Sequence, residues 1–376
     1  MGAPHAVVLV GGGHSHVQVL LAWAGDPPGD VRLTVVADRP TALYSGMVPG
    51  FVAGQYSRED LEIDVARLTR RAGGRFVLAP AIGLDPAARR LLVEGHPPEA
   101  YDTASLDVGS TVGGLDTPGV REHAIPTRPI AGFVNALGSL LDSARSRSRA
   151  RLVVVGGGAG GVELAFAFTR RLGAERLGGA TVELLEAGPG ILPGYPAAAV
   201  RRILANARAR GIGVRPAARV VRAEPDAVIL HTGEAVPCDC LVWVGGAAPV
   251  PLLARTGLDA DERGFLRVEP TLQCRGRSDV FASGDCASLD EAPWLPKAGV
   301  YAVRQGPVLE ANLRVRVAGG ALRRYRPQRD FLSLLNLGDG RAVGAKWGRA
   351  VEGAWVFRLK DWIDRRFVER FRDGAA

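Results

Sequence analysis

Short apolar runs of strand length alternate with longer amphipathic stretches over most of the chain. Residues 6–10 (AVVLV) form one such run, and the stretch VQVLLAW that begins at Val17 follows it with the pattern of a helix. The same order returns at residues 151–155 (RLVVV), before a second helical stretch and the run TVELLE at 181–186. A continuous apolar run bounded by a glycine turn is typical of a parallel strand that is covered on both faces. The pattern predicts an α/β fold with two similar strand–turn–helix units.

The pattern changes in three later places. Residues 143–151 (SARSRSRAR) are polar and basic without apolar periodicity, which indicates the end of a helix and a linker. Residues 331–348 (FLSLLNLGDGRAVGAKWG) alternate around a Gly-Asp-Gly turn in the manner of a hairpin. The last helical stretch, which begins at Trp355, places large apolar side chains on roughly one face: Trp355, Leu359, Trp362, Ile363, Phe367 and Phe371.

The glycine turn after residue 155 matches the G-x-G-x-x-G fingerprint of a dinucleotide site with Gly156, Gly158 and Gly161. The first glycine permits a tight turn, the second lets the backbone approach a pyrophosphate, and the third lets the helix pack on the strand. The free amides and the positive dipole end of the helix then face the phosphates. The next strand ends in Glu186, where an acid accepts hydrogen bonds from ribose hydroxyls and repels a 2′-phosphate. The sequence therefore predicts a site for NAD rather than NADP.

The turn after residue 10 is less regular. Gly11 and Gly13 occupy the first two glycine positions, but His16 stands at the third, which predicts looser packing of the helix on the strand. His14 and His16 are expected to pack, to cap the helix or to contact a phosphate or ribose rather than to bind a metal, because the neighbourhood lacks further ligands. The acid after the next strand is Asp38, although the usual acid position can also fall on Ala37. The residues assigned to the dinucleotide here are Gly11, Gly13, His14, Ser15, His16, Asp38 and Arg39.

A third motif lies at 279–287, where the run DVFASGDCA leads into a Gly-Asp turn. Two dinucleotide sites followed by such a turn resemble the two-dinucleotide-binding flavoproteins of the pyridine nucleotide-disulfide oxidoreductase superfamily. The resemblance implies that Gly284 and Asp285 hold FAD, with the Asp285 carboxylate accepting a ribityl hydroxyl; the alternative role of Asp285 is a helix N-cap. The segments SLDVGST (105–111) and LVWVGGAAP (241–249) resemble the crossovers of these proteins and assign Gly109 and Gly246 to the cofactor sites.

Within this superfamily the chain resembles the type II NADH dehydrogenases, and most closely a bacterial subgroup associated with selenide, water dikinase. The segments that carry this resemblance are GGGHSHVQVL, YSGMVPGFVAGQYS, SLDVGST and PKAGVYAVRQGPVL. It implies that the amides of Gly299 and Val300 face the pyrimidine edge of the flavin. It also implies that backbone from 45 to 49 lines the isoalloxazine ring, which assigns Ser45, Gly46, Met47 and Pro49 to FAD.

The resemblance implies two Rossmann-like FAD/NAD(P)-binding domains in a three-layer ββα arrangement, followed by a small C-terminal α+β region. The FAD-binding domain is expected to comprise residues 1–145 and 251–320, because the Gly-Asp turn follows the second phosphate turn along the chain. The NAD(H)-binding domain is expected at 146–250 and the C-terminal region at 321–376.

A flavin beside a nicotinamide indicates hydride transfer, so the chain is expected to be an FAD-dependent NADH dehydrogenase that reduces a quinone or another small acceptor. Glu163, at the family's Gly-Val-Glu position, is expected near the nicotinamide; its alternative role is a first-turn acid favoured by the helix dipole. Lys297 is expected to flank the flavin and to stabilise developing negative charge, with a solvated surface cation as the alternative. Of the family's quinone-side motif A-Q-x-A-x-Q-Q only Ala302 and Gln305 are retained, which leaves the acceptor open.

Two other functions remain open. The disulfide reductases of this superfamily carry a redox cysteine pair after the second strand of the first nucleotide unit, and no cysteine precedes residue 238 here, so a dithiol mechanism is not expected. The cysteines are Cys238, Cys240, Cys274 and Cys286. A sulfide- or selenium-linked flavoprotein would use Cys286, which the motif map places near the flavin. A redox sensor that binds FAD and NAD and acts through a protein partner is excluded by no sequence feature.

The net charge of +8 favours anionic cofactors, an acidic membrane surface or nucleic acid. Nucleic acid is the weakest of these, because the basic runs lack interleaved aromatic residues. No apolar run reaches the roughly 18 residues of a membrane span, and the cysteines form no framework of the secreted kind, so a cytoplasmic protein is expected. The last helix is expected to pack on the protein or on a second subunit of a homodimer, or else to lie on the inner face of the cell membrane.

Overall fold

The computed structural model describes residues 3–147, 149–175 and 179–372, and its first sheet contains five parallel strands. The strand order is β21–β9–β1–β2–β5, with β1 in the centre. Because helices and a second layer cover both faces of this sheet, β1 is a run of buried apolar residues. The bounds are β1 (His5–Val10), β2 (Val31–Ala37), β5 (Arg75–Leu78), β9 (Thr103–Leu106) and β21 (Val280–Ala282).

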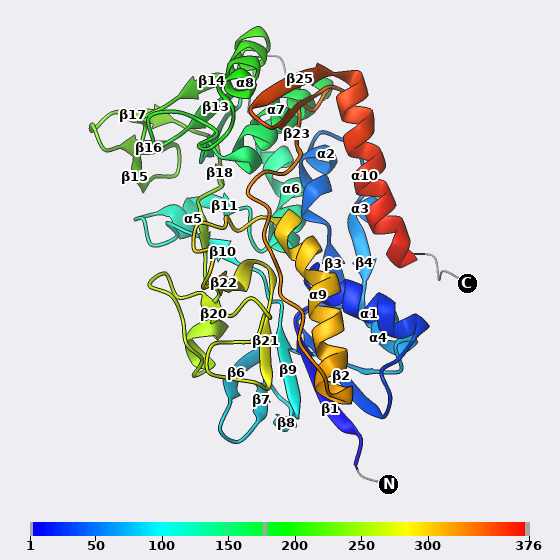
Figure 1. Ribbon diagram of the computed structural model, residues 1–376. Helices are drawn as coiled ribbons and strands as arrows, with labels where there is room; N and C mark the ends of the chain where they lie inside the picture. Colours follow the sequence, from blue (N-terminus) through cyan, green and yellow to red (C-terminus); the bar gives the residue numbers. More distant parts are fainter. Residues whose placement is uncertain (1–2, 148, 176–178, 373–376) are drawn as a thin grey trace.

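Three helices cover one side of the first sheet and a small antiparallel sheet lies on the other (Figure 1). The helices are α1 (His16–Gly25), α4 (Val65–Arg71) and α9 (Gly299–Ala318). The antiparallel sheet consists of β6 (Ala81–Asp85), β7 (Arg90–Val93) and β8 (Glu99–Ala100). This is the three-layer ββα arrangement that the sequence predicts.

The second sheet repeats the plan with five parallel strands in the order β11–β18–β12–β13–β14. Its strands are β11 (Ala124–Pro126), β12 (Arg151–Val155), β13 (Thr181–Leu185), β14 (Gly213–Arg215) and β18 (Cys240–Trp243). The antiparallel meander beside it comprises β15 (Val220–Ala223), β16 (Ala227–Leu230) and β17 (Ala235–Pro237). The helices of this domain are α6 (Ile130–Arg145), α7 (Ala159–Ala174) and α8 (Ala197–Ala209). The predicted fold class, two Rossmann-like domains, is confirmed.

The second sheet begins earlier in the chain than the expected domain limit at residue 145. β11 pairs in parallel with β18, and α6 packs on both strands. β11 is too short to stand out as an apolar run, which is why the sequence placed it in the first domain. The polar segment 143–151 connects the end of α6 at Arg145 to the start of β12 at Arg151; its residue Ser148 lies outside the described residues.

The two crossovers between the domains pair with each other. β10 (Thr111–Val112) runs antiparallel to β19 (Ala247–Ala248). Immediately beyond this pair, the amide of Gly113 donates to the carbonyl of Gly246 over 2.6 Å. Gly246, assigned to a cofactor from the sequence, is thus part of the joint between the domains.

The C-terminal region contacts both domains. The strands β23 (Ser333–Asn336), β24 (Ala342–Lys346) and β25 (Arg349–Gly353) form the antiparallel hairpin sheet expected around the Gly-Asp-Gly turn. This sheet packs on α7 and α8 of the second domain. The last helix, α10 (Ala354–Arg372), packs on α3 (Arg58–Leu61) and β4 (Glu62–Asp64) of the first (Figure 1).

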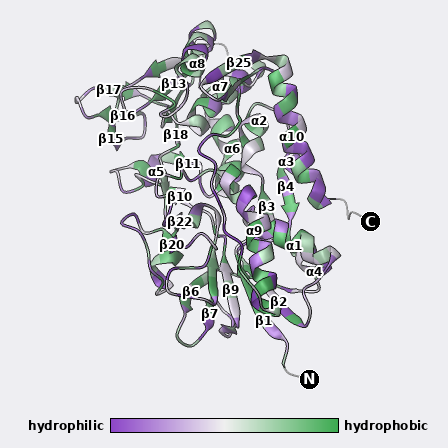
Figure 2. Ribbon diagram, in the orientation of Figure 1, coloured by the Kyte–Doolittle hydropathy of each residue, from purple (hydrophilic) through white to green (hydrophobic). Residues whose placement is uncertain are grey.

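The buried stripe of α10 differs from the predicted one. Phe367 and Phe371 are buried as expected, but Trp355 and Trp362 are 52% and 56% exposed, and Ile363 is exposed as well. The buried stripe instead contains Val356, Lys360 and Asp364. The expected apolar face is thus only partly buried, because two charged residues one turn apart can be buried when they neutralise each other. Figure 2 shows the largely hydrophilic character of this helix.

Candidate cofactor and active site

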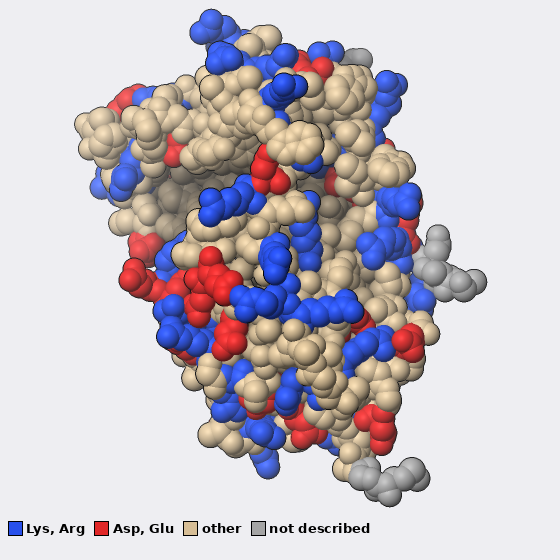
Figure 3. Space-filling view, viewed as in Figure 1, with Lys and Arg blue, Asp and Glu red and all other residues tan. Residues whose placement is uncertain are grey.

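A cavity of about 480 Å³ lies where the two domains meet. Residues Gly11–His14 of the first phosphate turn line it, as do Gly160, which belongs to the second phosphate turn, and Leu164 of α7, which follows that turn. Figure 3 shows a hollow in the molecular surface beside the meander, with Lys and Arg side chains spread over the whole face viewed. The predicted site residues that line the cavity are Gly11, Gly13, His14, Asp38, Arg39, Ser45, Pro49, Gly109, Asp285 and Gly299.

His16 has a structural role in the first turn. Its side chain is completely buried, with Nδ1 2.7 Å from the carbonyl oxygen of Gly11 and Nε2 2.8 Å from Ser105 Oγ. Because a carbonyl only accepts, Nδ1 carries the proton and the Ser105 hydroxyl donates to Nε2. Burial lowers the pKa of His16 to about 4, so the ring is neutral. It therefore bridges helix and strand at the position where this turn lacks its third glycine.

Asp107 is the main residue of this site that the sequence did not single out. It follows β9, is 3% exposed, and its Oδ2 accepts hydrogen bonds from the amides of Ser15 over 2.8 Å and His16 over 3.2 Å. Burial raises the pKa of Asp107 to about 6. The carboxylate thus occupies the N-terminus of α1 and lines the cavity. An acid directly after an apolar strand, within the segment SLDVGST, was the available signal.

The predicted ribityl acceptor Asp285 lies in the turn η3 (Gly284–Cys286) and lines the cavity. Its Oδ2 accepts hydrogen bonds from Ser110 Oγ over 2.9 Å and from Arg128 Nη1 over 2.8 Å. Both partners line the cavity too, and neither was predicted. Arg128 forms an ion pair with Asp285. The carboxylate can still accept a hydrogen bond from a neutral hydroxyl, which is the group that a ribityl chain offers.

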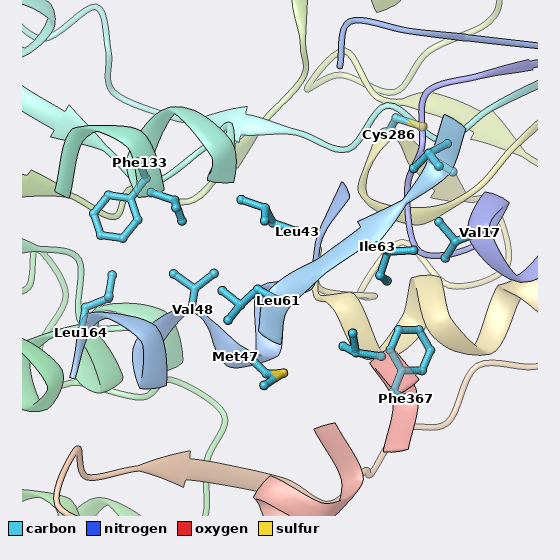
Figure 4. Packing of buried hydrophobic residues seen from close by; sticks show 14 of the residues in the cluster. Val17, Leu43, Met47, Val48, Leu61, Ile63, Phe133, Leu164, Cys286 and Phe367 are labelled. Atoms are coloured by element: carbon cyan, nitrogen blue, oxygen red, sulfur yellow. The ribbon is translucent and has the colours of Figure 1, made fainter. Parts of the chain in front are cut away.

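The segment expected to line the isoalloxazine ring forms η1 (Ser45–Met47) and α2 (Val48–Val52). Ser45 and Pro49 line the cavity. Met47 is 1% exposed and packs into the core with Leu61 and Phe367 nearby (Figure 4). The Gly46 carbonyl accepts a hydrogen bond from Lys360 Nζ over 2.8 Å, so α10 supports this wall from behind.

Helix α10 also supports the first phosphate turn. The rings of His14 and Phe367 are stacked, with centroids 6.2 Å apart, and Tyr44 contacts both rings. The hydroxyl of Ser15 is buried and donates to the carbonyl of Ala302 in α9 over 2.8 Å. Ser15 and His16 thus hold the turn in place, while His14 lines the cavity.

The second phosphate turn has the geometry that its fingerprint predicts. Gly156 has a φ of +118°, which favours glycine, and a Cβ on Gly161 would lie 1.8 Å from the carbonyl oxygen of Gly156. Gly158 is the N-cap of α7. Both carboxylate oxygens of Glu186 accept backbone amides, from Gly157 and Gly188, each over 2.6 Å. The acid is therefore held rigidly beside the turn.

Glu163 lies in the first turns of α7 and is partly buried. Its Oε1 accepts a hydrogen bond from the amide of Asn336 in β23 over 2.8 Å. Burial raises the pKa of Glu163 to about 7, although the nearby Lys360 opposes this shift. Lys360 itself forms a buried ion pair of 2.7 Å with Asp364. Glu163 can therefore hold or release a proton near neutral pH.

Lys297 lies on the far side of the Gly-Asp turn. Its ammonium donates to the carbonyl of Ala287 and sits 4.1 Å from the centre of the Phe265 ring. It lines a second, polar pocket of about 400 Å³ together with Asp261 and Asp290. Of the cationic residues that the structure describes, Arg39 and Arg128 line the larger cavity and Lys297 does not.

Gly284 and Val300 are neighbours in sequence of the lining residues Asp285 and Gly299 but do not belong to the described lining of the cavity. A Cβ on Gly284, whose φ is +68°, would lie 2.5 Å from Asp107 Oδ1, so a side chain cannot be accommodated at this point. Val300 is part of the first turn of α9, next to the lining residue Gly299.

The four cysteines are all buried and free. Burial raises the pKa of each thiol, that of Cys286 to about 12. Cys286 Sγ donates to the carbonyl of Ser283 at 3.1 Å. A nucleophilic cysteine needs a lowered pKa and access to its substrate, so this arrangement disfavours the sulfide- or selenium-linked alternative.

The sequence profile of the pyridine nucleotide-disulphide oxidoreductase family matches residues 5–306. The chain belongs to this family. Its relatives include a demethylphylloquinone reductase of Synechocystis, 25% identical over 95% of this chain and 92% of the relative. The NADH dehydrogenase-like protein YutJ of Bacillus subtilis is 23% identical over 95% and 97% of the two chains.

Two solved structures support the fold. The sulfide:quinone oxidoreductase from Aquifex aeolicus superposes with a TM-score of 0.84 at 17% identity, covering 98% of this chain and 92% of that one. NDH2 from Plasmodium falciparum in complex with NADH superposes with a TM-score of 0.80 at 13% identity, covering 97% and 98% of the two chains. At these identities the likeness concerns the fold alone.

FAD and NADH are the cofactors of this family member, and the residues present fit them. At the first turn a Cβ on Gly11, whose φ is +88°, would lie 2.5 Å from the carbonyl oxygen of Asp107, so only glycine leaves room for a close backbone approach. In the described part of the chain, the amides of Gly12 and His14 have no hydrogen-bond partner and are available to phosphate oxygens. The protein is therefore an FAD-dependent NAD(P)H oxidoreductase. Within its described residues, no helix has the length and apolar character needed to cross a bilayer.

Proposed function

We propose that the protein oxidises NADH and delivers the electrons to a quinone. The observation that carries this proposal is the single cavity lined by residues from both phosphate turns, which brings the two dinucleotides together. The relatives named as an NADH dehydrogenase-like protein and as a demethylphylloquinone reductase support both halves of the reaction. FAD bound in the cavity supplies the chemistry that accepts a hydride and passes its two electrons to an acceptor.

The chain's own residues orient the reactants and supply protons. Gly160 and Leu164 form the wall that the second domain contributes to the cavity, where the nicotinamide arrives. Reduction of a quinone to a quinol takes up two electrons and two protons, whereas NADH supplies two electrons and one proton as hydride. Glu163, with a pKa raised to about 7 by burial, can hold the second proton and recover it from solvent.

Anaerobic stopped-flow absorbance tests the proposal. Mixing with NADH is expected to bleach the flavin band near 450 nm faster than mixing with NADPH, and a soluble quinone added afterwards is expected to restore the band rapidly. In Glu163→Gln the flavin band is expected to bleach at the normal rate with NADH and to recover slowly with quinone. The control variant Glu269→Gln, at an exposed position, is expected to behave as wild type. Rapid bleaching without reoxidation by any quinone would favour the redox-sensor alternative. Equal rates of return in both variants would remove Glu163 from the proton pathway.

We further propose that the outer face of α10 and the hairpin tip lie on an anionic membrane, which is where a lipid-soluble quinone resides. The hairpin tip is the turn between β24 and β25, and it carries Trp347, which is 75% exposed. Helix α10 adds the exposed Trp355 and Trp362. The cations Lys346 and Arg366 contact the Trp347 and Trp362 rings. Exposed tryptophans among basic side chains match the interface of an anionic bilayer. The protein would accordingly be a peripheral protein of the inner membrane face.

Vesicle flotation tests this surface. The protein is expected to float with vesicles containing phosphatidylglycerol and to stay behind with purely zwitterionic vesicles. Replacing Trp355 and Trp362 by serine is expected to abolish flotation. Trp294→Ser, which removes a tryptophan that is 45% exposed and lies outside α10, is expected to leave flotation unchanged. A homodimer in solution that the same double variant splits would instead assign this face to a second copy of the chain.

A further inference from the structure

The N-terminus of α1 already contains an anion before FAD is considered. The Asp107 carboxylate accepts the amides of Ser15 and His16 and lines the cavity beside His14. The diphosphate of FAD requires the same helix end, because the free amides of this turn and the positive end of the α1 dipole lie there. Two anionic groups therefore converge on one helix terminus.

Asp107 cannot withdraw to make room. A Cβ on Gly13 would lie 2.2 Å from Asp107 Oδ1, and one on Gly284 would lie 2.5 Å from the same oxygen. The carboxyl group is thus enclosed between the first phosphate turn and the Gly-Asp turn. These two glycines leave space for the carboxyl and for little else.

The charged and titratable groups around Asp107 leave its charge uncompensated. His14 faces it from the turn, but burial lowers the pKa of that ring. The His16 ring is neutral and bonded elsewhere. Asp285 and the Cys286 thiol face it from η3, and Arg128 pairs with Asp285 rather than with Asp107.

We propose that Asp107 is a proton-holding residue of the FAD diphosphate site: the nucleotide binds together with one proton from solvent, which Asp107 retains and donates to a diphosphate oxygen. His14 supports a ligand at this position, because its ring lines the cavity and its Nε2 has no hydrogen-bond partner among the described residues. A protonated carboxyl keeps one oxygen as acceptor for the Ser15 amide and gains one donor for the phosphate. The inference rests on FAD binding and is independent of the electron acceptor.

The sign of the expected pH dependence follows from linkage. Without FAD the pKa of Asp107 is raised to about 6 by burial, and a neighbouring diphosphate raises it further. Between these two pKa values the complex holds one proton more than the separated partners, so the dissociation constant of FAD rises about tenfold per pH unit. Below pH 6 it is expected to be constant.

The experiment dilutes the flavin-loaded protein at a series of pH values from 5 to 9 and measures released FAD by its fluorescence. Wild type is expected to show the tenfold rise per unit above about pH 6. Asp107→Asn, which keeps an acceptor and a donor without a charge, is expected to lose the slope and to bind FAD more tightly than wild type at pH 8. Asp102→Asn is the matched control, because its carboxylate also accepts a backbone amide, that of Ala6 over 2.8 Å, away from the cavity.

Three outcomes would overturn the proposal. The first is a wild-type dissociation constant that does not vary with pH, and this result needs no variant to fold. The second is an Asp107→Asn protein with the wild-type slope. The third is a pH dependence of the FAD dissociation constant that persists in Asp107→Asn and disappears in His14→Asn. This result would show that His14, not Asp107, holds the proton. Failure of the quinone assay would leave all three readouts unchanged.

Discussion

The Lys360 ammonium lies 2.7 Å from the Asp364 carboxylate inside the protein, where the two side chains are only 8% and 7% exposed. Lys360 also donates to the Gly46 carbonyl, while Asp364 is within 3.3 Å of the Tyr44 hydroxyl. The pair thus connects the last helix to the segment that lines the flavin cavity. Its neutrality explains why charged residues form part of the core-facing stripe of α10.

Replacing only one residue of the Lys360–Asp364 pair is expected to destabilise the folded protein far more than replacing both. Lys360→Met leaves the Asp364 carboxylate buried without a cation and is expected to lower the free energy of unfolding by about 3–5 kcal/mol. The double variant with Asp364→Leu is expected to recover most of this loss. Urea unfolding of the single and double variants measures the difference; equal losses would show that the two charges are not coupled.

The stability contribution of Glu163 is expected to depend on pH. The pKa is about 7 in the folded protein against 4.5 as its ordinary value, so the folded state binds the proton more tightly. The associated stability is fully present below pH 4.5 and is lost as the pH rises through 7. Glu163→Gln removes this dependence and is expected to be more stable relative to wild type at pH 8 than at pH 5, by roughly 1–3 kcal/mol. Thermal unfolding at both pH values checks this, and the same difference at each pH would contradict it.

Placing a glycine at position 16, the third glycine position of the first turn, is expected to destabilise the folded protein. His16→Gly would leave a cavity between helix and strand and would leave the Ser105 hydroxyl without its partner. The combined loss is expected to be about 2–4 kcal/mol in the free energy of unfolding. His16→Gln, which retains polar groups for Gly11 and Ser105, is expected to recover part of it. Chemical denaturation of both variants provides the measurement, and a His16→Gly protein as stable as wild type would refute the packing role.

The rigid carboxylate of Glu186 is expected to control nicotinamide binding without affecting the flavin. Glu186→Gln places an amide donor against the amide of Gly157 or Gly188, so one hydrogen bond is lost. The KM for NADH is expected to rise about tenfold, equivalent to one hydrogen bond of about 1.4 kcal/mol, with the FAD content unchanged. Glu183→Gln on the same strand is the control, because that acid is only loosely paired with Arg215 at 3.6 Å. A loss of FAD from Glu186→Gln would contradict this prediction, because it would assign Glu186 to the FAD site instead of the NADH site.

The phosphate turns could be predicted from the sequence because their requirements are local. A positive φ at Gly156 and the close approach at Gly161 leave only glycine possible, so the spacing alone identifies the turn. The Gly-Asp turn and the hairpin of the C-terminal region are local for the same reason. Their motifs are complete within about ten residues of chain.

The residues that the sequence did not identify depend on contacts between distant segments. Arg128 gains its meaning only from Asp285, which lies 157 residues further along the chain. The buried face of α10 follows from partners in the first domain, and the helical periodicity alone favoured the tryptophans instead. Lys297 illustrates the opposite case: its proximity in sequence to the flavin motif does not place its ammonium in the flavin cavity, because the side chain turns towards Phe265.

The position of α10 after all the cavity-lining residues has a consequence for biosynthesis. Every described residue that lines the FAD cavity has left the ribosome by the time Ala302 emerges. The supports behind that cavity, Lys360 on Gly46 and Phe367 on His14, are made only after all of these lining residues. The lining of the cavity is therefore synthesised before its supports, so α10 is expected to dock onto flavin-binding segments that have already been made.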